Sequence, residues 1–262
     1  MWDEWMPALQ LGVTPEQFRQ LPRHPAYLYE YLNGIAYLSP RPRTFHAILD
    51  LNASLPPDLP PRSDVVLRAV GRADRAELVV AFASAFDQAQ PFAGLDEARR
   101  REAARQVLDR TFAGGDGPWI ADASFAAWQE GPALSRPRLV GAMLVTLVPG
   151  GDPADRDSYL WMEPPPPDCL ERRLGQPHLT WVFVVPDLSR RGVATSLLAA
   201  VRDALRRRGY SQLLSTFMSG NEASVLWHWR QGFRLVEHPG AGRRWRRAIA
   251  PDGGGPALPR AS

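Results

Sequence analysis

The chain has 262 residues, of which 45% are hydrophobic and 23% are charged, and this composition excludes a protein that is disordered throughout. It contains no run of about 20 apolar residues, and no basic patch followed by an apolar stretch near its start, so we expect neither a membrane span nor a secretory signal, and a cytoplasmic location. The net charge is +3, and all 31 cationic side chains are arginines, which excludes any mechanism that uses a lysine of this chain.

Residues 1–51 are predicted to form a small separate module, whose role the sequence leaves open. Residues 27–31 and 35–38 are typical of two strands, and the Asn-Gly pair between them supplies the two positive-φ positions of a type I′ turn. Residues 52–63 hold four prolines, which cannot continue a helix or a central strand. We therefore expect a β-hairpin module followed by a proline-rich linker.

The next part of the chain alternates between strand and helix patterns. The predicted elements are a strand at 65–70, helices at 73–88 and 95–112, and strands at 119–128 and 139–148. Residues 149–176 then form a long irregular insertion rich in Gly and Pro, and loops of that length are often functional. The insertion contains Cys169, the one cysteine of the sequence, which disfavours a cysteine-based zinc site, and we predict no metal.

The last part of the sequence predicts the remaining elements of one domain over residues 64–247. They are a strand at 178–185, a helix at 192–208, a strand at 213–217, a helix at 221–231, and two segments, 233–236 and 244–247, that could close the sheet. Apolar residues recur at helical spacing in the first of these helices, so we expect one of its faces to pack against a sheet. Residues 248–262 are predicted to be a disordered tail.

The connection before the helix at 192–208 holds a candidate anion site. Gly192 and Ala194 let the backbone approach a ligand closely, and a helix start offers free N–H groups at the positive end of its dipole. Arg190 and Arg191 add positive charge directly before them. The segment matches neither the lysine-containing phosphate loop nor the dinucleotide glycine fingerprint. It predicts a site suited to a diphosphate, although a plain helix start with surface arginines would show the same pattern.

Two motifs in this region resemble those of the GNAT superfamily of acyl-CoA-dependent N-acyltransferases. The segment from Val184 to Ala194 is similar to the family's motif A, and the segment from Asn221 to Phe233 is similar to its motif B. One position departs, because Ser189 stands where the family usually has Gln or Arg. The resemblance covers residues 64–247 and implies an α/β fold with a mixed, mostly antiparallel sheet of six to seven strands flanked by about four helices.

The resemblance also implies how acetyl-CoA would bind as a co-substrate. In GNAT folds two neighbouring strands part, and the pantetheine arm lies in the gap like an additional strand. The residues that would bind it are Phe183, Val184 and Val185 through their backbone, Arg190, Arg191, Gly192, Val193, Ala194 and Thr195 through their N–H groups, and Asn221 at the pantetheine arm. An amine would attack the thioester directly, without a protein nucleophile.

Two histidines occupy the positions where the family usually has its base and its acid. His178 lies eight residues before the motif A proline, at the place of the common glutamate base, and His228 lies seven residues after the motif B asparagine, at the place of the usual tyrosine acid. Imidazole, with an ordinary pKa of about 6.5, can do either task at neutral pH. We predict His178 as the base and His228 as the acid, with a solvent chain as the alternative for either, and Glu163 and Asp168 as spare bases.

The sequence leaves two other functions open. One is a catalytically silent acyl-CoA-binding module, since the usual Glu and Tyr are both replaced. The other is a nucleic-acid-binding protein, since residues 187–247 hold 12 arginines against 4 acidic residues, a balance of +8. No helix-turn-helix or RNA-binding signature accompanies that charge, so we predict acetyl transfer from acetyl-CoA to an amine. The acceptor amine, the acyl length and the oligomeric state stay open.

Overall fold

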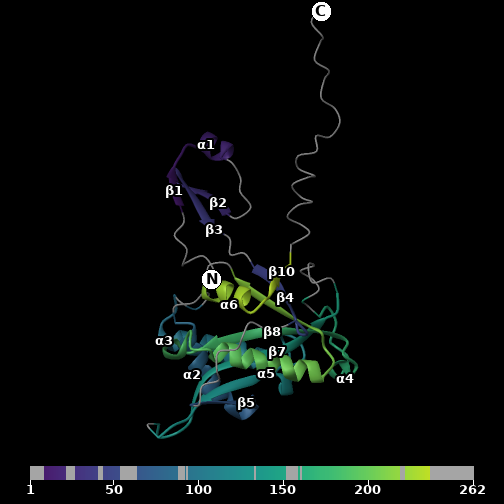
Figure 1. Cartoon of the computed structure of the whole chain (residues 1–262). Helices are drawn as coiled ribbons and strands as arrows, with labels where there is room; N and C mark the ends of the chain where they lie inside the picture. Colours follow the sequence, from purple (N-terminus) through teal and green to yellow (C-terminus); the bar gives the residue numbers. More distant parts are fainter. Residues whose placement is uncertain are drawn as a thin grey trace, which may run out of the picture.

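The computed structural model describes residues 9–21, 27–40, 44–53, 64–87, 92, 94–132, 134–151, 159, 161–218 and 222–236, which form two β-sheets and the helices around them (Figure 1). The small sheet has the strand order β1-β3-β2, with β1 at Leu9–Gly12, β2 at Tyr27–Leu32 and β3 at Ile35–Pro40. The predicted hairpin is present, because β2 pairs antiparallel with β3 and both turn residues, Asn33 and Gly34, have positive φ. A short helix, α1 (Pro15–Gln20), lies between β1 and β2 in the chain.

The large sheet has seven strands in the order β10-β4-β9-β8-β7-β6-β5. Their bounds are β4 Thr44–Asp50, β5 Val65–Ala69, β6 Phe125–Gln129, β7 Arg138–Pro149, β8 Gly175–Val184, β9 Gln212–Met218 and β10 Arg234–Leu235. All neighbours pair antiparallel except β8 and β9, which are parallel. The predicted mixed, mostly antiparallel α/β fold is therefore confirmed.

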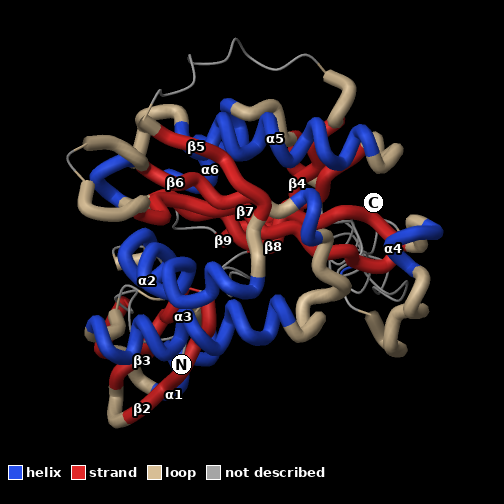
Figure 2. Tube along the Cα trace, turned by 90° about the horizontal axis from the view of Figure 1, so that it is seen from below, coloured by secondary structure: helices blue, strands red, loops and turns tan. Residues whose placement is uncertain are grey.

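Helices cover both faces of this sheet (Figure 2). The four longer ones are α2 (Arg75–Ala85) and α3 (Glu97–Phe112) on one face and α5 (Val193–Arg207) and α6 (Glu222–Arg230) on the other, and each confirms a predicted helix to within three residues. The apolar stripe of α5 is buried against the sheet, with Leu197, Leu198, Val201 and Leu205 fully inaccessible. A fifth, α4 (Cys169–Arg172), is a single turn inside the insertion. No helix in the described ranges has the length and apolar character that crossing a bilayer requires.

The N-terminal module was predicted to extend to residue 51, and this boundary is wrong because the strand before it, β4, belongs to the large sheet. The segment 44–50 forms β4 and pairs with β9 over its full length, between β9 and β10 of the large sheet. Alternate residues of β4 explain its place there, because Ala47 and Leu49 are buried in the main core. Arg202 of α5 fixes the turn that follows by donating to the carbonyls of Leu51 (2.8 Å) and Ala53 (2.6 Å).

One further strand prediction is wrong in part, and several predicted segments lie outside the described residues. The strand predicted at 119–128 is wrong in its first half, where Ala121–Ala123 forms a turn of 3-10 helix and Ser124 accepts and donates hydrogen bonds across it. The segment 244–247 and the tail at 248–262 lie outside the described residues, as does most of the linker at 52–63. Since β4 pairs with both β9 and β10, the N-terminal part of the chain contributes to the large sheet that we had assigned to residues 64–247.

Candidate active site

The strands β8 and β9 part in the middle of the sheet. They pair at only two positions, His178 with Leu214 and Leu179 with Ser215, although β8 continues to Val184 with β7 as its partner on the other side. The N–H of Val185 donates to Val140 of β7 at 2.9 Å. Because backbone groups alternate along a strand, the N–H and C=O of Val184 point away from β7, toward the side from which β9 has withdrawn. The predicted cofactor-binding residues 183–185 thus lie beyond this fork.

The backbone beyond the fork leads directly to the start of α5. A turn of 3-10 helix at Pro186–Leu188 is followed by two residues with positive φ, Arg190 (58°) and Gly192 (85°). Within the described residues, no N–H group from Arg190 to Thr195 donates to a backbone carbonyl, and the first helical bond runs from Ser196 N–H to the Gly192 carbonyl at 2.9 Å. We call residues 190–195 the amide cradle. No side chain caps this helix start, so the cradle presents open donors at the positive end of the helix dipole.

An ion pair holds the entrance to the amide cradle. Arg138, the first residue of β7, donates from both of its terminal nitrogens to the Asp187 carboxylate, at 2.9 and 3.0 Å. The hydrogen bonds from Arg138 lower the pKa of Asp187, although burial acts in the opposite direction. Thr195 at the other end of the cradle accepts a hydrogen bond from Gln231 at 3.2 Å. The predicted diphosphate residues are therefore brought together on one connection that is tied to β7 and to the end of α6.

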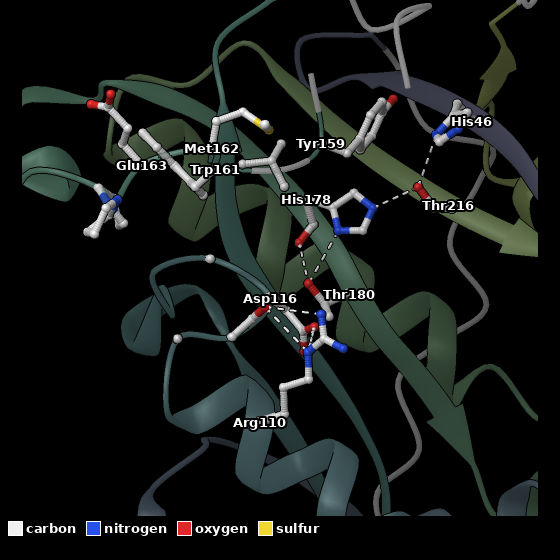
Figure 3. Close-up of a pocket in the computed structure, with 16 residues that line it drawn as sticks. His46, Arg110, Asp116, Tyr159, Trp161, Met162, Glu163, His178, Thr180 and Thr216 are labelled. Carbon is white, nitrogen blue, oxygen red and sulfur yellow. Dashed lines mark hydrogen bonds and ion pairs between the residues drawn. The ribbon is translucent and has the colours of Figure 1, made fainter. Parts of the chain in front are cut away.

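A pocket of about 890 Å³ opens beside the fork, on the side of the sheet that α3 covers (Figure 3). Its polar wall comes from three strands and its other walls come from the end of α3 and from the insertion. The lining residues are His46, Arg110, Gly114, Gly115, Asp116, Gly117, Val148, Tyr159, Trp161, Met162, Glu163, Pro164, Pro165, His178, Thr180 and Thr216. The pocket combines an apolar and aromatic rim with hydroxyl and imidazole groups at its base, which suits an organic molecule with a polar end.

Five side chains form a continuous hydrogen-bonded row at the base of this pocket. His46 Nδ1 lies 3.2 Å from the Thr216 hydroxyl, which lies 2.9 Å from His178 Nε2. His178 Nδ1 lies 3.3 Å from the Thr180 hydroxyl, which lies 2.8 Å from that of Thr146. In Figure 3 the two imidazoles approach Thr216 from opposite sides. The row crosses β4, β9, β8 and β7, so neighbouring strands of the sheet bring these groups together.

The row ends on a backbone carbonyl whose position requires glycine. Thr146 donates to the Asp116 carbonyl at 2.9 Å. The next residue, Gly117, has φ of 101°, and a Cβ there would lie 2.2 Å from the Leu147 carbonyl oxygen. Only glycine lets this loop cross β7 so closely. The Asp116 side chain is held separately by Arg110 (2.9 Å) and by the Thr111 hydroxyl (2.6 Å).

His178, the predicted base, is neutral at physiological pH. Burial, with a smaller contribution from the nearby His46, lowers the pKa of His178 to about 3. Tyr159 packs against both rings, with centroid distances of 4.3 Å to His46 and 5.6 Å to His178. The structure therefore encloses His178 between a second histidine and a tyrosine that the sequence analysis did not single out.

His228, the predicted acid, lies on the opposite face of the sheet. Its Nε2 is 2.8 Å from the Ser215 hydroxyl, and its Nδ1 donates to the Ser224 carbonyl at 2.7 Å. The ring stacks on Phe217 (4.2 Å) and is only 2% exposed. Burial lowers its pKa to about 4. His228 thus adjoins the fork through Ser215, but it does not line the pocket.

The remaining predicted site residues divide between these regions. Glu163 lines the pocket, whereas Asp168 lies outside its lining and is 3.5 Å from Arg172. Asn221 lies outside the described residues. His46 and Thr216 were not among the predicted site residues. The alternating pattern of residues 44–50 could have identified the strand that carries His46, but nothing in the sequence pairs that strand with β9.

The comparisons with known proteins concern the region that carries these features. Residues 119–233 match the family model described as the acetyltransferase (GNAT) family. No curated protein matches the chain. Similar solved structures include a GCN5-related N-acetyltransferase from Sphaerobacter thermophilus, at 14% identity and a TM-score of 0.47, over 87% of this chain and 56% of that chain.

Two further structures have coenzyme A bound. One is the PaiA N-acetyltransferase from Thermoplasma acidophilum, at 10% identity and a TM-score of 0.44, over 66% of this chain and 91% of that chain. The other is the aminoglycoside N-acetyltransferase AAC(6')-Iy, at 19% identity and a TM-score of 0.39, over 68% and 93%. The region that matches the acetyltransferase (GNAT) family model, residues 119–233, thus includes the fork, the amide cradle and α6.

Proposed function

We propose that the protein transfers an acetyl group from acetyl-CoA to an amine that binds in the pocket, by direct attack within a ternary complex. The observation that carries this proposal is the continuity of the fork with the amide cradle inside the family-matched region. A pantetheine arm requires a strand edge with open backbone groups, and a diphosphate requires several convergent N–H donors. The chain offers both within one connection of β8 to α5.

In this proposal each part of the cofactor has its own residues. The N–H groups of Arg190 to Thr195, with the charges of Arg190 and Arg191, hold the diphosphate. The N–H and C=O of Val184, which point away from β7, pair with the pantetheine arm, and Asn221 contacts that arm. Phe183 and Val185 were predicted to pair with it as well, but their backbone groups face β7, where the Val185 N–H donates to the Val140 carbonyl. The thioester would then lie at the fork, next to Thr216 and His178.

The pocket binds the acceptor amine and provides the side chain that removes its proton. An amine becomes much more acidic as it attacks a thioester carbonyl, so a neutral imidazole can accept its proton at that stage. With its pKa lowered to about 3, His178 is neutral over the physiological range but a weaker base than an ordinary histidine, so it can take the proton only after attack has made the amine acidic. It lies at the base of the pocket. We therefore propose His178 as the final acceptor of that proton.

The group that would protonate the departing thiolate is not identified by the same contacts. The neutral His228 ring has no N–H group to spare, because its Nδ1–H is donated to Ser224 and its Nε2 lies against Ser215. The role of His228 as the acid stays a prediction, and solvent is the alternative. Two further points also stay predictions: that the transferred acyl group is acetyl, and that the protein is located in the cytoplasm.

The proposal is tested by incubating the full chain with acetyl-CoA and a broad panel of primary amines, and by measuring the release of free CoA thiol. We expect release that depends on an amine and forms its N-acetyl product. Binding of acetyl-CoA without turnover of any amine would instead indicate the silent module. A thermal-shift series with acetyl-CoA, CoA and longer acyl-CoAs measures the binding itself and the preferred acyl length, because a ligand at about 100 times its Kd adds about 2.7 kcal/mol of stability.

A further inference from the structure

The direction of every hydrogen bond in the row at the base of the pocket is fixed by its last member. The Asp116 carbonyl can only accept, so the one hydroxyl proton of Thr146 is committed to it at 2.9 Å. In the 2.8 Å contact between Thr146 and Thr180, the proton must then come from Thr180. A competing contact from Thr180 to the His178 carbonyl is longer, at 3.4 Å.

The same reasoning continues through both histidines. Because the Thr180 proton is used, the 3.3 Å contact with His178 requires a proton on His178 Nδ1. A neutral imidazole carries one proton, so His178 Nε2 is an acceptor and Thr216 must donate to it over 2.9 Å. His46 Nδ1 must in turn donate to Thr216 over 3.2 Å. Both histidines are thus held in the Nδ1–H form.

This order has a consequence for catalysis. Both nitrogens of His178 are engaged within the protein, so an amine in the pocket cannot donate directly to His178 without displacing Thr216. The Thr216 hydroxyl donates to one histidine and accepts from the other, which leaves one of its two lone pairs. Thr216 lines the pocket and is the first residue of β9 beyond its last pair with β8. It is therefore the polar group that an amine at the fork would meet.

We propose that Thr216 is a proton-relay residue and that His46 is the positioning residue that orients its hydroxyl, an inference that rests on the proposed acetyl transfer. As the amine attacks the thioester, its N–H bond breaks and an O–H bond forms at Thr216 Oγ1. The original Thr216 O–H bond breaks at the same time, and an N–H bond forms at His178 Nε2. The net change is the transfer of one proton from the amine to His178, with the Thr216 hydroxyl restored.

His46 makes this assignment specific to the present chain. It comes from β4, which lies outside the family-matched region, and it reaches the site because β4 pairs with β9 in a register that sets His46 opposite Thr216. By donating to Thr216 it directs the hydroxyl proton toward His178 and away from the pocket. The N-terminal part of the chain thereby supplies a component of the site.

The resting enzyme, without any acceptor, tests the hydrogen-bond order. The probe is long-range proton–nitrogen NMR on protein labelled with ¹⁵N-histidine, in which the two neutral tautomers give different patterns. The His178→Gln and His46→Asn variants assign the signals. We expect the Nδ1–H form for both His178 and His46, and the Nε2–H form of His178 would overturn the relay even if the enzyme acetylates amines.

Kinetics with the amine that the panel identifies tests the relay itself. Thr216→Val keeps the β-branched shape and removes the hydroxyl, and we expect kcat to fall about 100-fold or more, with the KM for acetyl-CoA unchanged. Thr216→Ser should restore most of kcat, and His46→Asn, which keeps a donor near the place of Nδ1, should retain more activity than His46→Leu. Gln212→Ala, an exposed change on the same strand, is the matched control.

Each outcome of these kinetics decides the inference. A Thr216→Val enzyme with unchanged kcat would overturn the relay and leave the proposed acetyl transfer intact. Equal activity of His46→Asn and His46→Leu would overturn the role of His46. A wild-type protein that binds acetyl-CoA and acetylates no amine would overturn the proposed function, and the relay with it.

Discussion

The two faces of β9 at the fork carry the same pair of groups in different surroundings. Ser215 points to one face and contacts His228, and Thr216 points to the other and contacts His178, with O···N distances of 2.8 and 2.9 Å. Both imidazoles have a lowered pKa, to about 4 and about 3. A hydrogen-bonded histidine with a perturbed pKa is therefore not enough to identify a base.

The neighbours of the two rings make the difference. His228 is surrounded by Phe217, Trp227 and Phe233, with ring centroids 4.2 to 4.8 Å away, and it fills a space between α6 and the sheet. His178 instead borders a pocket of about 890 Å³. We infer that access to a cavity, and not hydrogen bonding or pKa, separates the two histidines in function.

The largest effect that this comparison predicts is on turnover. His178→Gln keeps a polar side chain of similar length and removes the basic nitrogen, so we expect kcat to fall by about 100-fold to 1,000-fold, as is typical for loss of a general base. Steady-state kinetics with the identified amine measures it, together with a Kd for acetyl-CoA that should not change. A His178→Gln enzyme with wild-type kcat would show that the proton leaves by another route.

The matched change on the other face is predicted to act on stability. His228→Ala removes a buried ring from an aromatic cluster and leaves Ser215 and Ser224 without their partner, and we expect a loss of about 3 kcal/mol in the free energy of unfolding. Urea unfolding followed by tryptophan fluorescence measures it. A stable His228→Ala variant whose kcat falls sharply would instead support the predicted role of His228 as the acid.

Both histidines, one on each face of β9, should make the free energy of unfolding depend on pH. The folded pKa values of His178 and His228 lie below the value of 6.5 expected in the unfolded chain, so the unfolded state binds more protons in between. Stability from these groups is present above pH 6.5 and is lost as pH falls toward 4, with a slope of up to about 1.4 kcal/mol per pH unit for each histidine.

Urea unfolding at a series of pH values between 7.5 and 4 checks this slope. The His178→Gln and His228→Ala variants should each remove about half of it, because each removes one of the two titrating groups. A wild-type unfolding free energy that stays constant over this range would show that the two rings are not kept neutral by the fold.

The smallest predicted difference comes from neighbouring hydroxyls. Ser215→Ala leaves His228 Nε2 without its partner, and we expect a loss of about 1 to 2 kcal/mol in unfolding free energy with kcat unchanged. The adjacent Thr216→Val change leaves His178 Nε2 and His46 Nδ1 without their partner, so it should cost a similar amount of unfolding free energy but, unlike Ser215→Ala, it should also lower kcat. Parallel unfolding and kinetic measurements on the two variants check this, and similar kcat values for both would remove the distinction between the two faces.

The sequence allowed the amide cradle to be predicted because its determinants are local. Gly192, the two arginines before it and the apolar stripe of α5 lie within one strand–helix connection, and the structure has them as one continuous segment. The hairpin at Asn33-Gly34 was predictable for the same reason, since its turn type depends on two adjacent residues.

The relay could not be predicted because it depends on the register of strands distant in sequence. His46 and Thr216 are 170 residues apart, and they meet only because β4 pairs with β9. A period-2 pattern identifies a strand but does not state its partner. The carbonyl of Asp116, which sets the order of the hydrogen bonds, depends in turn on how closely the loop at Gly117 crosses β7.

The proposed activity requires that the N–H groups of Arg190 to Thr195 bind the acyl-CoA diphosphate. The direct measurement is a titration of ¹⁵N-labelled protein with coenzyme A, followed by backbone amide chemical shifts. We predict that the largest shifts belong to residues 190–195, and that the Val184 amide shifts with them as the pantetheine arm pairs along β8. Saturating coenzyme A that leaves these amides unchanged, whether by binding elsewhere or not at all, would contradict the account.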